Sequence, residues 1–363
     1  MFIDRPDIEP GIKIAAQVTP KPTEDEMTFM QAMGMDHITE DDLPFIKQMG
    51  VEYAAVWTGG ERAGYEFYRS SREMLENEGI KLYALGNLSV HNVPAITLGL
   101  PGRDEKIEEY KEHIRNLGKA GIPYTTYAHM ANGIWNTARE TTRGGAPTRA
   151  FDLAKAETGT WDGEIYRMPL SHGRRYSEDE IWDNFEYFIK QVAPVAEEAG
   201  VKIGIHPDDP PVPELAGIPR CIFSSFEGYK RAMEIAGSPN VGLCLCVGCW
   251  LEGGDLMGRN ILETIRYFGE RKKIFKVHFR NVNAPLPHFA ETFLDAGYMD
   301  MYPIMRALRA VDFDGIIMPD HIPAMTDNHR VGTAFSIAYM KGLLERANSE
   351  FANSKFANAE LAE

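Results

Sequence analysis

Short apolar segments alternate with longer amphipathic segments along almost the whole chain. Runs of about four to eight apolar residues predict buried strands, whereas apolar positions three and four residues apart predict helices. Eight strand-like runs, separated by helical patterns, occur at residues 12–18, 51–57, 80–85, 123–130, 201–206, 241–247, 274–281 and 315–320. Strands that alternate with helices pair in parallel, and eight such units favour closure into a (β/α)8 TIM barrel over an open sheet.

Local signals place several helix ends. Ser177, followed three residues later by Glu180, has the sequence of a capping box and predicts a helix over 177–199. A second helix is predicted over 226–236. Glycine accepts the left-handed turn that ends a helix, and it stands just before four of the predicted strands, at Gly50, Gly79, Gly121 and Gly200.

Two segments depart from this repeat. Residues 131–176, after the fourth strand, are rich in Gly, Thr and Arg. An insertion of this length in a compact domain is usually a lid or a binding element, and the alternative is a disordered surface loop. Residues 347–363 are polar and rich in Ala and Asn, which predicts a peripheral tail or a frayed helix. We therefore expect one barrel domain over 1–346.

Composition and charge limit the possible partners. The content of 44% hydrophobic and 25% charged residues is that of a globular protein. A net charge of −15 argues against a nucleic-acid partner. It leaves an anionic substrate open, because a metal ion and local arginines can invert the potential of one pocket. No apolar run reaches about 18 residues and no basic leader precedes one, which predicts a cytoplasmic protein without a membrane partner.

Four residues of metal-binding types lie at the ends of four successive predicted strands. His206 ends the fifth strand, Cys246 lies at the end of the sixth, His278 is late in the seventh and Asp320 ends the eighth. Barrel enzymes carry their chemistry at these carboxyl ends. Each residue alone is more often part of a core, but together they predict one metal site. Two imidazoles, a thiolate and a carboxylate are compatible with Mn²⁺, Fe²⁺, Co²⁺ or Zn²⁺.

Side-chain alternation supports this geometry, because the polar residues of these strands share faces. Lys276, His278 and Arg280 lie on one face of the seventh strand. All four cysteines fall within residues 221–249, which is not the pattern of a disulfide framework. The spacing of the last three could also indicate a zinc or iron–sulfur centre. The chain has no second cysteine pair to complete a cysteine-only site, which disfavours that alternative.

Four short motifs together resemble one enzyme family. They are His206-Pro-Asp-Asp-Pro-Pro211, Cys246-x-Gly248, His278-Phe-Arg280 and Pro319-Asp320-His321. They resemble the mannonate dehydratases of the xylose-isomerase-like barrel superfamily, over most of the chain and most densely from about residue 200. The resemblance implies loss of water from D-mannonate to give 2-keto-3-deoxy-D-gluconate. It also implies a divalent metal, usually manganese, held at His206, Cys246, His278 and Asp320, and a homo-oligomer, which we expect to be a dimer.

The resemblance suggests roles for four further residues. It implies proton transfer by His321, and the alternative is that His321 only orients Asp320. Arg280 could bind a substrate carboxylate with both of its terminal nitrogens, or form a salt bridge at the barrel mouth. His91 and Trp135 match family positions and could wall the sugar site.

The chain also departs from the family pattern. The family carries a Tyr at the start of the last helix, whereas residues 332–336 contain none, so His329 and Tyr339 are the nearest substitutes and His329 is a candidate catalytic residue. Residues 57–60 and 86–87 replace a His pair and a Glu of the family. We therefore expect a divergent member. The leading hypothesis is a metal-dependent sugar-acid lyase, and the alternatives are an isomerase or epimerase of the same superfamily and a non-enzymatic barrel with a structural metal.

Overall fold

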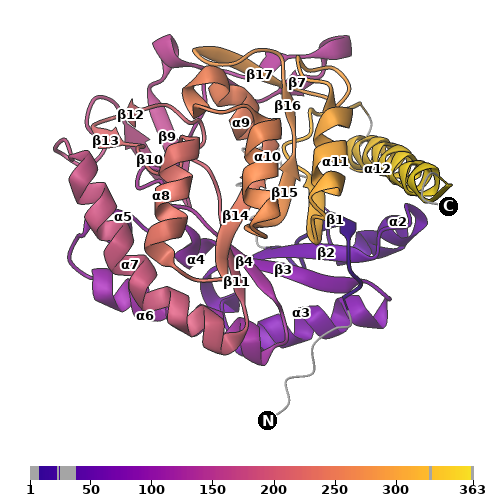
Figure 1. Ribbon diagram of the computed structural model, residues 1–363. Coiled ribbons are helices and arrows are strands. Elements are labelled where there is room, and N and C mark those ends of the chain that lie inside the picture. Colours follow the sequence, from indigo (N-terminus) through magenta and orange to yellow (C-terminus); the bar gives the residue numbers. More distant parts are fainter. Residues whose placement is uncertain (1–7, 23, 25–37, 327–328, 361–363) are drawn as a thin grey trace.

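The computed structural model describes residues 8–22, 24, 38–326 and 329–360 (Figure 1). Eight parallel strands close into a barrel in the order β1-β18-β15-β14-β11-β4-β3-β2. Their bounds are β1 Ile12–Val18, β2 Tyr53–Thr58, β3 Lys81–Asn87, β4 Tyr124–Tyr127, β11 Lys202–Ile205, β14 Val241–Cys246, β15 Ile274–Phe279 and β18 Gly315–Pro319. All eight predicted strands are present, and the predicted (β/α)8 barrel is confirmed.

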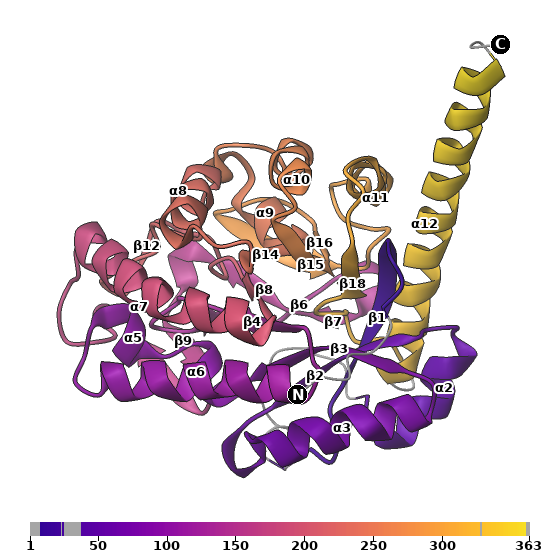
Figure 2. The ribbon, with the colours of Figure 1, turned by 60° about the horizontal axis from the view of Figure 1, so that its bottom comes forward.

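Helices surround the barrel (Figures 1 and 2). Their bounds are α2 Leu43–Gln48, α3 Tyr65–Asn77, α4 Leu88–His91, α5 Pro94–Leu98, α6 Arg103–Lys119, α7 Glu178–Ala199, α8 Phe226–Ala236, α9 Val247–Gly253, α10 Ile261–Glu270, α11 Met301–Ala310 and α12 His329–Glu360. Short 3₁₀ helices lie at Glu40–Asp42, Gly60–Arg62, Arg143–Gly145, Leu153–Lys155 and Gly254–Met257. Within the part of the chain that the structure describes, no helix combines the length and apolar character needed to cross a bilayer.

The predicted helix boundaries agree with the structure. Ser177 caps α7 with both hydrogen bonds of a capping box, and Gly200 ends the helix at φ 63°. Gly50, Gly79 and Gly121 also have positive φ. Figure 2 shows α12 continuing away from the barrel, and this helix includes residues 347–360, where the sequence predicted a tail or a frayed helix.

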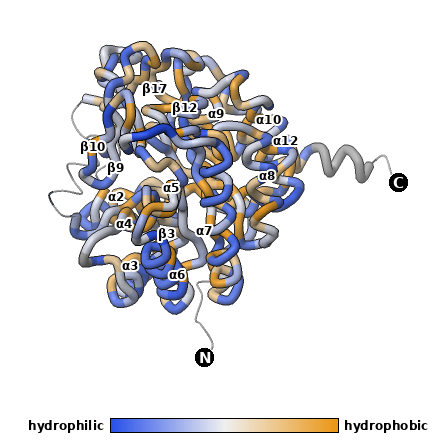
Figure 3. The backbone as a smooth tube through the Cα atoms, turned by 90° about the vertical axis from the view of Figure 1, so that its left-hand side faces the viewer, coloured by the Kyte–Doolittle hydropathy of each residue, from blue (hydrophilic) through white to orange (hydrophobic). Residues whose placement is uncertain are grey.

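The apolar core has two parts. The larger part lies between the outer faces of the strands and the helices, and Figure 3 shows hydrophilic stretches along the outward sides of α6 and α7. The smaller part fills the barrel interior with Ala15, Tyr53, Ala55, Tyr83, Ala84, Tyr124, Phe275, Ile316 and Met318. Several of these residues begin their strands, so the amino-terminal end of the barrel is packed with side chains and polar chemistry is left to the other end.

The insertion after β4 contains strands of its own. They are β5 Ile134–Trp135, β6 Glu140–Thr141, β7 Pro147–Thr148, β8 Ala150–Asp152, β9 Thr158–Trp161 and β10 Glu164–Arg167. Strand β8 pairs with β17 (His288–Thr292), which also pairs with β16 (Asn281–Val282). A further hairpin joins β12 (Glu214–Leu215) to β13 (Ile218–Pro219). Strand β8 of the insertion therefore shares a sheet with the segment that follows β15. This pairing argues against a disordered surface loop for residues 131–176.

Candidate metal centre

The four candidate ligands lie at the carboxyl ends of four neighbouring barrel strands. Cys246 ends β14, His278 is the penultimate residue of β15, and His206 and Asp320 directly follow β11 and β18. The strand order places β18, β15, β14 and β11 side by side, and the register pairs Cys246 with His278. The closed parallel sheet therefore brings His206 and Asp320, which are 114 positions apart in the sequence, to the same end of the barrel.

Distances place these side chains in two overlapping groups. The Cys246 sulfur lies 3.8 Å from Asp320 Oδ2, and His278 Nδ1 lies 3.5 Å from the same oxygen. Donor atoms of Cys246, His278 and Asp320 lie within 4.8 Å of one another, as do those of His206, Cys246 and Cys249. The ring centroids of His206 and His278 are 5.1 Å apart. Cys246 is the member that both groups share.

The two imidazoles are prepared for ligation. His206 Nδ1 lies 2.8 Å from the carbonyl oxygen of Pro207. A carbonyl only accepts, so Nδ1 carries the proton and Nε2 keeps a free lone pair, as in most metal-binding histidines. His278 Nδ1 is buried and makes no hydrogen bond among the described residues, although Asp320 Oδ2 lies 3.5 Å away. An unpartnered buried polar atom is costly, and a metal ion at this point would remove that cost.

Cys246 is held in the form that binds metals. It caps the N-terminus of α9, and the backbone N–H of Cys249 donates to its sulfur at 3.5 Å. Burial alone raises the pKa of the Cys246 thiol, but hydrogen bonding from Cys249 and the charge of Arg280 outweigh it and hold that pKa well below its usual value. Burial, and a hydrogen bond between its own thiol and Cys246, raise the pKa of the Cys249 thiol well above its usual value. Thiolates are the ligands, which favours Cys246 over Cys249.

A second cluster of metal-binding types already contains a cation. Donor atoms of Asp209, Cys249 and Glu252 lie within 4.8 Å of one another. Nη2 of Arg280 lies 2.8 Å from Glu252 Oε1 and 3.2 Å from both Asp209 Oδ2 and the Cys249 sulfur. A guanidinium at the centre of this triad takes the position that a metal ion would need.

Arg280 is bound by the protein itself. Its side chain is 1% exposed, and Nη1 lies 3.1 Å from Asp320 Oδ2 and 3.2 Å from Glu291 Oε1. These contacts favour the alternative in which Arg280 forms salt bridges within the protein over the one in which it binds the substrate carboxylate. The ion pairs are buried, whereas the sequence predicted them at the barrel mouth. Through Asp320, Arg280 orients one of the candidate ligands.

His321 lies beside Asp320, as expected, in an unusual backbone conformation with φ 47°. Its Nδ1 lies 2.8 Å from Glu291 Oε1 and also contacts Arg280 Nη1, while Nε2 is 3.9 Å from Asp320 Oδ1. The ring lines a cavity of about 20 Å³, together with Asp320 and Thr333. A cavity of this volume holds about one water molecule.

The side of the site formed by the segments after β2 and β3 is aromatic. His91 donates from Nδ1 to the Thr126 carbonyl oxygen at 2.9 Å and stacks on Trp161 at 5.0 Å between ring centroids. Trp57 meets the edge of the same imidazole at 4.9 Å. Burial lowers the pKa of His91 to about 3, so the ring is neutral. Trp161 was missed by the sequence analysis, because it lies in a short strand of the insertion without a motif.

Two predicted residues lie away from any open surface of the site. Trp135 is 0% exposed, and its indole N–H donates to the Asn132 carbonyl oxygen at 3.0 Å. In this structure Trp135 packs inside the insertion, whereas Trp161 lies against His91. Tyr339 is half-buried on α12, where burial and the charges of Asp300 and Asp295 raise its pKa. His329 begins α12, but its side chain lies outside the described residues.

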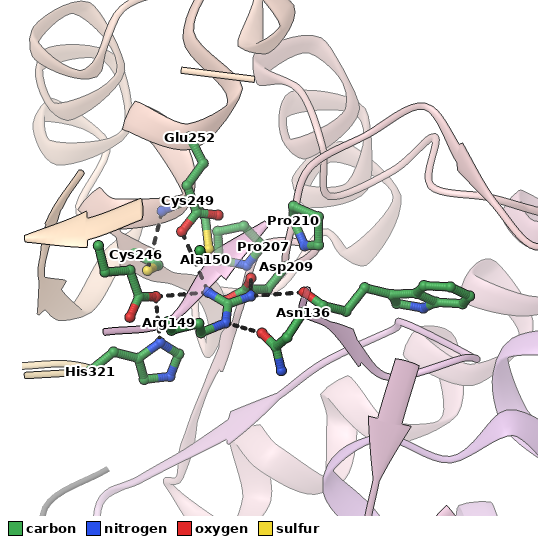
Figure 4. A network of polar contacts seen from close by, with 12 residues as sticks. Asn136, Arg149, Ala150, Pro207, Asp209, Pro210, Cys246, Cys249, Glu252 and His321 are labelled. Atoms are coloured by element: carbon green, nitrogen blue, oxygen red, sulfur yellow. Dashed lines mark hydrogen bonds and ion pairs between the residues drawn. The ribbon is translucent and has the colours of Figure 1, made fainter. Parts of the chain in front are cut away.

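A buried ion network around the site was also missed. Arg149, from the insertion, donates from Nη1 to Glu291 Oε1 at 2.8 Å and from Nη2 to the Trp135 carbonyl oxygen at 3.2 Å, and it forms an ion pair with Asp209 (Figure 4). Side chains of Arg149, Asp209, Glu252 and Glu291 are at most 3% exposed. The network joins the insertion to the candidate metal centre through His321 and Arg280.

Comparison of the sequence with known proteins gives consistent matches. A family model described as D-mannonate dehydratase (UxuA) matches residues 42–354. The mannonate dehydratase of Streptococcus pneumoniae (strain 70585) is 34% identical over 269 residues, which cover 69% of this chain and 72% of that protein. The mannonate dehydratase of Oceanobacillus iheyensis is 32% identical over 302 residues, with coverage of 76% and 83%.

Comparison of the structure with solved structures agrees. The mannonate dehydratase from Streptococcus suis serotype 2 superimposes with a TM-score of 0.79 at 27% identity, covering 95% of both chains. An L-ribulose 3-epimerase superimposes with a TM-score of 0.59 at 13% identity, covering 94% of this chain and 98% of that one. The second match shows a shared fold alone.

Proposed function

This chain belongs to the mannonate dehydratase family, and we propose that it removes water from D-mannonate to give 2-keto-3-deoxy-D-gluconate with the help of a divalent metal ion. The observation that carries the proposal is the convergence of two imidazoles, a cysteine of low pKa and a carboxylate at the ends of four adjacent strands. The ligands proposed are His206, Cys246, His278 and Asp320. A homodimer is proposed on the family resemblance, and the cytoplasmic location expected from the sequence is kept as a proposal.

The donor set fits a divalent ion of the first transition series. His278 Nδ1 makes no hydrogen bond within the described residues, and the proton of His206 on Nδ1 leaves Nε2 as the nitrogen that would bind the ion. Imidazole, thiolate and carboxylate together suit Mn²⁺, Fe²⁺, Co²⁺ or Zn²⁺, and we propose Mn²⁺. When bound, such an ion would polarise the substrate carboxylate and its neighbouring hydroxyl and so make the C2–H bond more acidic.

The chain's own residues supply positioning and a proton. His321, next to Asp320, is the proposed acid–base group: its Nε2 takes the proton from C2 and then gives a proton to the departing C3 hydroxyl, which leaves as water. His321 lines a cavity together with Asp320, one of the candidate ligands. His91, neutral and held between Trp57 and Trp161, is proposed to wall the opposite side of the sugar. Arg280 fixes the orientation of Asp320 and is not assigned to the substrate.

The test combines metal reconstitution with a matched pair of cysteine variants. Chelator-treated protein is reloaded with Mn²⁺ and incubated with D-mannonate, and the 2-keto-3-deoxy product and bound metal are measured. We expect product only after reloading. Cys246→Ser should lose metal and activity, whereas Cys221→Ser, which alters a cysteine outside the site, should keep both. Metal-loaded protein that yields no product from D-mannonate would overturn the proposal.

A further inference from the structure

Glu291 lies at the centre of the polar contacts around His321. It comes from β17, in the segment between β15 and α11, and its side chain is 1% exposed. A single oxygen, Oε1, lies 2.8 Å from His321 Nδ1, 2.8 Å from Arg149 Nη1 and 3.2 Å from Arg280 Nη1.

We propose that Glu291 is a positioning residue of the reaction, which holds His321 with its proton on Nδ1 so that Nε2 is the atom that exchanges a proton with the substrate. The inference rests on the proposed function for its catalytic meaning. The hydrogen bond on which it depends is a property of the structure and can be measured without substrate.

The choice of tautomer follows from the donors and acceptors available. Nδ1 of His321 contacts both Glu291 Oε1 and Arg280 Nη1, and one nitrogen cannot donate to the first and accept from the second. A guanidinium only donates, and Arg280 has acceptors of its own in Glu252 and Asp320. A carboxylate bound by two guanidiniums is ionised and only accepts. An unprotonated Nδ1 would face Glu291 Oε1 at 2.8 Å with lone pair against lone pair, so the proton is placed on Nδ1. The lone pair of the imidazole then lies on Nε2.

Nε2 is the ring nitrogen for which a contact with Asp320, one of the candidate metal ligands, is found. It lies 3.9 Å from Asp320 Oδ1, and the ring lines the small cavity beside Asp320. The left-handed backbone of His321 is a conformation that a non-glycine residue keeps only when its surroundings enforce it. The Glu291 hydrogen bond is one such constraint, since it fixes the ring of the residue that is strained.

The insertion supplies the support for Glu291. Arg149 binds Glu291 from the segment between β7 and β8, and the pairing of β8 with β17 aligns Phe151 with Phe289. Arg149 also pairs with Asp209, which lies three residues after His206. The residues around Arg149 thus hold Glu291, and through it His321, in a fixed position. A lid motion in this part of the insertion would break the buried ion pairs of Arg149.

The test uses Glu291→Gln, with Glu252→Gln as the matched control. Glu252 is 0% exposed and binds the same two arginines, but no contact joins it to His321 within the described residues. The full-length protein, loaded with diamagnetic Zn²⁺ and carrying ¹⁵N-labelled histidine, is studied by NMR, and the His321 signals are assigned by their loss in His321→Gln. We expect the native protein and Glu252→Gln to carry the His321 proton on Nδ1, and Glu291→Gln to lose that preference.

Kinetics with Mn²⁺ complete the test. Loss of the carboxylate that orients a catalytic histidine costs up to about 10⁴-fold in kcat in a well-studied hydrolase. We expect Glu291→Gln to lower kcat by about 100-fold or more with KM and bound metal little changed, and Glu291→Asp to recover part of the rate.

Two results would overturn the inference: a native His321 that carries its proton on Nε2, or a Glu291→Gln variant with unchanged tautomer and kcat. If Glu291→Gln fails to fold, the native spectrum still decides the tautomer. If the native protein shows the expected tautomer but does not dehydrate D-mannonate, the proposed function fails while the hydrogen bond stands.

Discussion

The buried network predicts a large loss of stability when Arg149 is replaced by Met, which keeps most of the side-chain length and removes the charge. Arg149 is 3% exposed and pairs with Asp209 and Glu291, both 1% exposed. Removing one partner of a buried ion pair costs about 3–5 kcal/mol, because the other charge stays buried without compensation. Arg280 still contacts both carboxylates, so we expect the lower end, about 3 kcal/mol.

The size of the protein converts this cost into a melting temperature. An unfolding entropy of about 2.1 cal/mol/K per residue gives about 0.8 kcal/mol/K for 363 residues. A loss of about 3 kcal/mol therefore lowers Tm by about 4 °C, which calorimetry or circular dichroism resolves.

Arg143→Met is the matched control, because Arg143 belongs to the same insertion and pairs with Asp295 at 2.7 Å, but its side chain is 51% exposed. An exposed pair contributes at most about 1 kcal/mol, so Tm should fall by about 1 °C or less. Equal shifts in Arg149→Met and Arg143→Met would refute the reasoning, since burial would then add nothing.

Three further predictions concern the wall of the site, acid stability and the metal ligand. Trp161→Ala should raise KM for the sugar acid, as steady-state kinetics will show. Trp135→Ala should lower the free energy of unfolding by about 3–5 kcal/mol because it leaves a cavity, and denaturant unfolding of both variants measures this. Burial lowers the pKa of His113 to about 3. Between about pH 6.5 and pH 3 the unfolded chain therefore binds a proton at this residue that the folded chain does not bind. The free energy of unfolding should fall as pH falls through this range. In urea titrations His113→Gln should flatten this dependence by up to about 1.4 kcal/mol per pH unit, and an unchanged slope would contradict the neutral, buried state. With Co²⁺ bound, a thiolate-to-metal absorption band should vanish in Cys246→Ala and persist in Cys249→Ala, and the opposite result would assign the ligand to Cys249.

The barrel and the convergence of the four candidate ligands were predictable because both depend on short-range patterns. Each strand is a compact apolar run, and a polar residue at its carboxyl end must lie at the mouth of a barrel. In the structure Cys246 pairs with His278 at the ends of the neighbouring strands β14 and β15, in agreement with this rule.

The ion network was not predictable, because its members lie on four separate segments with no common spacing: Arg149 in the insertion, Asp209 after β11, Glu252 in α9 and Glu291 in β17. Their proximity depends on how the insertion packs against the loops after the strands. Long-range pairing of this kind leaves no periodic signal in the sequence.

Trp135 and Trp161 illustrate the same limit. Both lie in strands of at most four residues within the insertion, where no amphipathic pattern tells the inner face from the outer one. The family resemblance drew attention to Trp135, whereas the antiparallel pairing of β9 with its neighbours places Trp161 against His91. The sequence therefore could not tell which of the two indoles lies against His91.

The central claim, a metal-assisted elimination at His206, Cys246, His278 and Asp320, is tested most directly by product analysis in deuterated water. Mn²⁺-loaded protein is incubated with D-mannonate in D₂O, and products and recovered substrate are examined by NMR and mass spectrometry. Elimination predicts 2-keto-3-deoxy-D-gluconate with one solvent deuterium at C3, where the hydroxyl departed. A C2-deuterated epimer or isomer, formed without any keto-deoxy product, would contradict the account and establish proton transfer without loss of water.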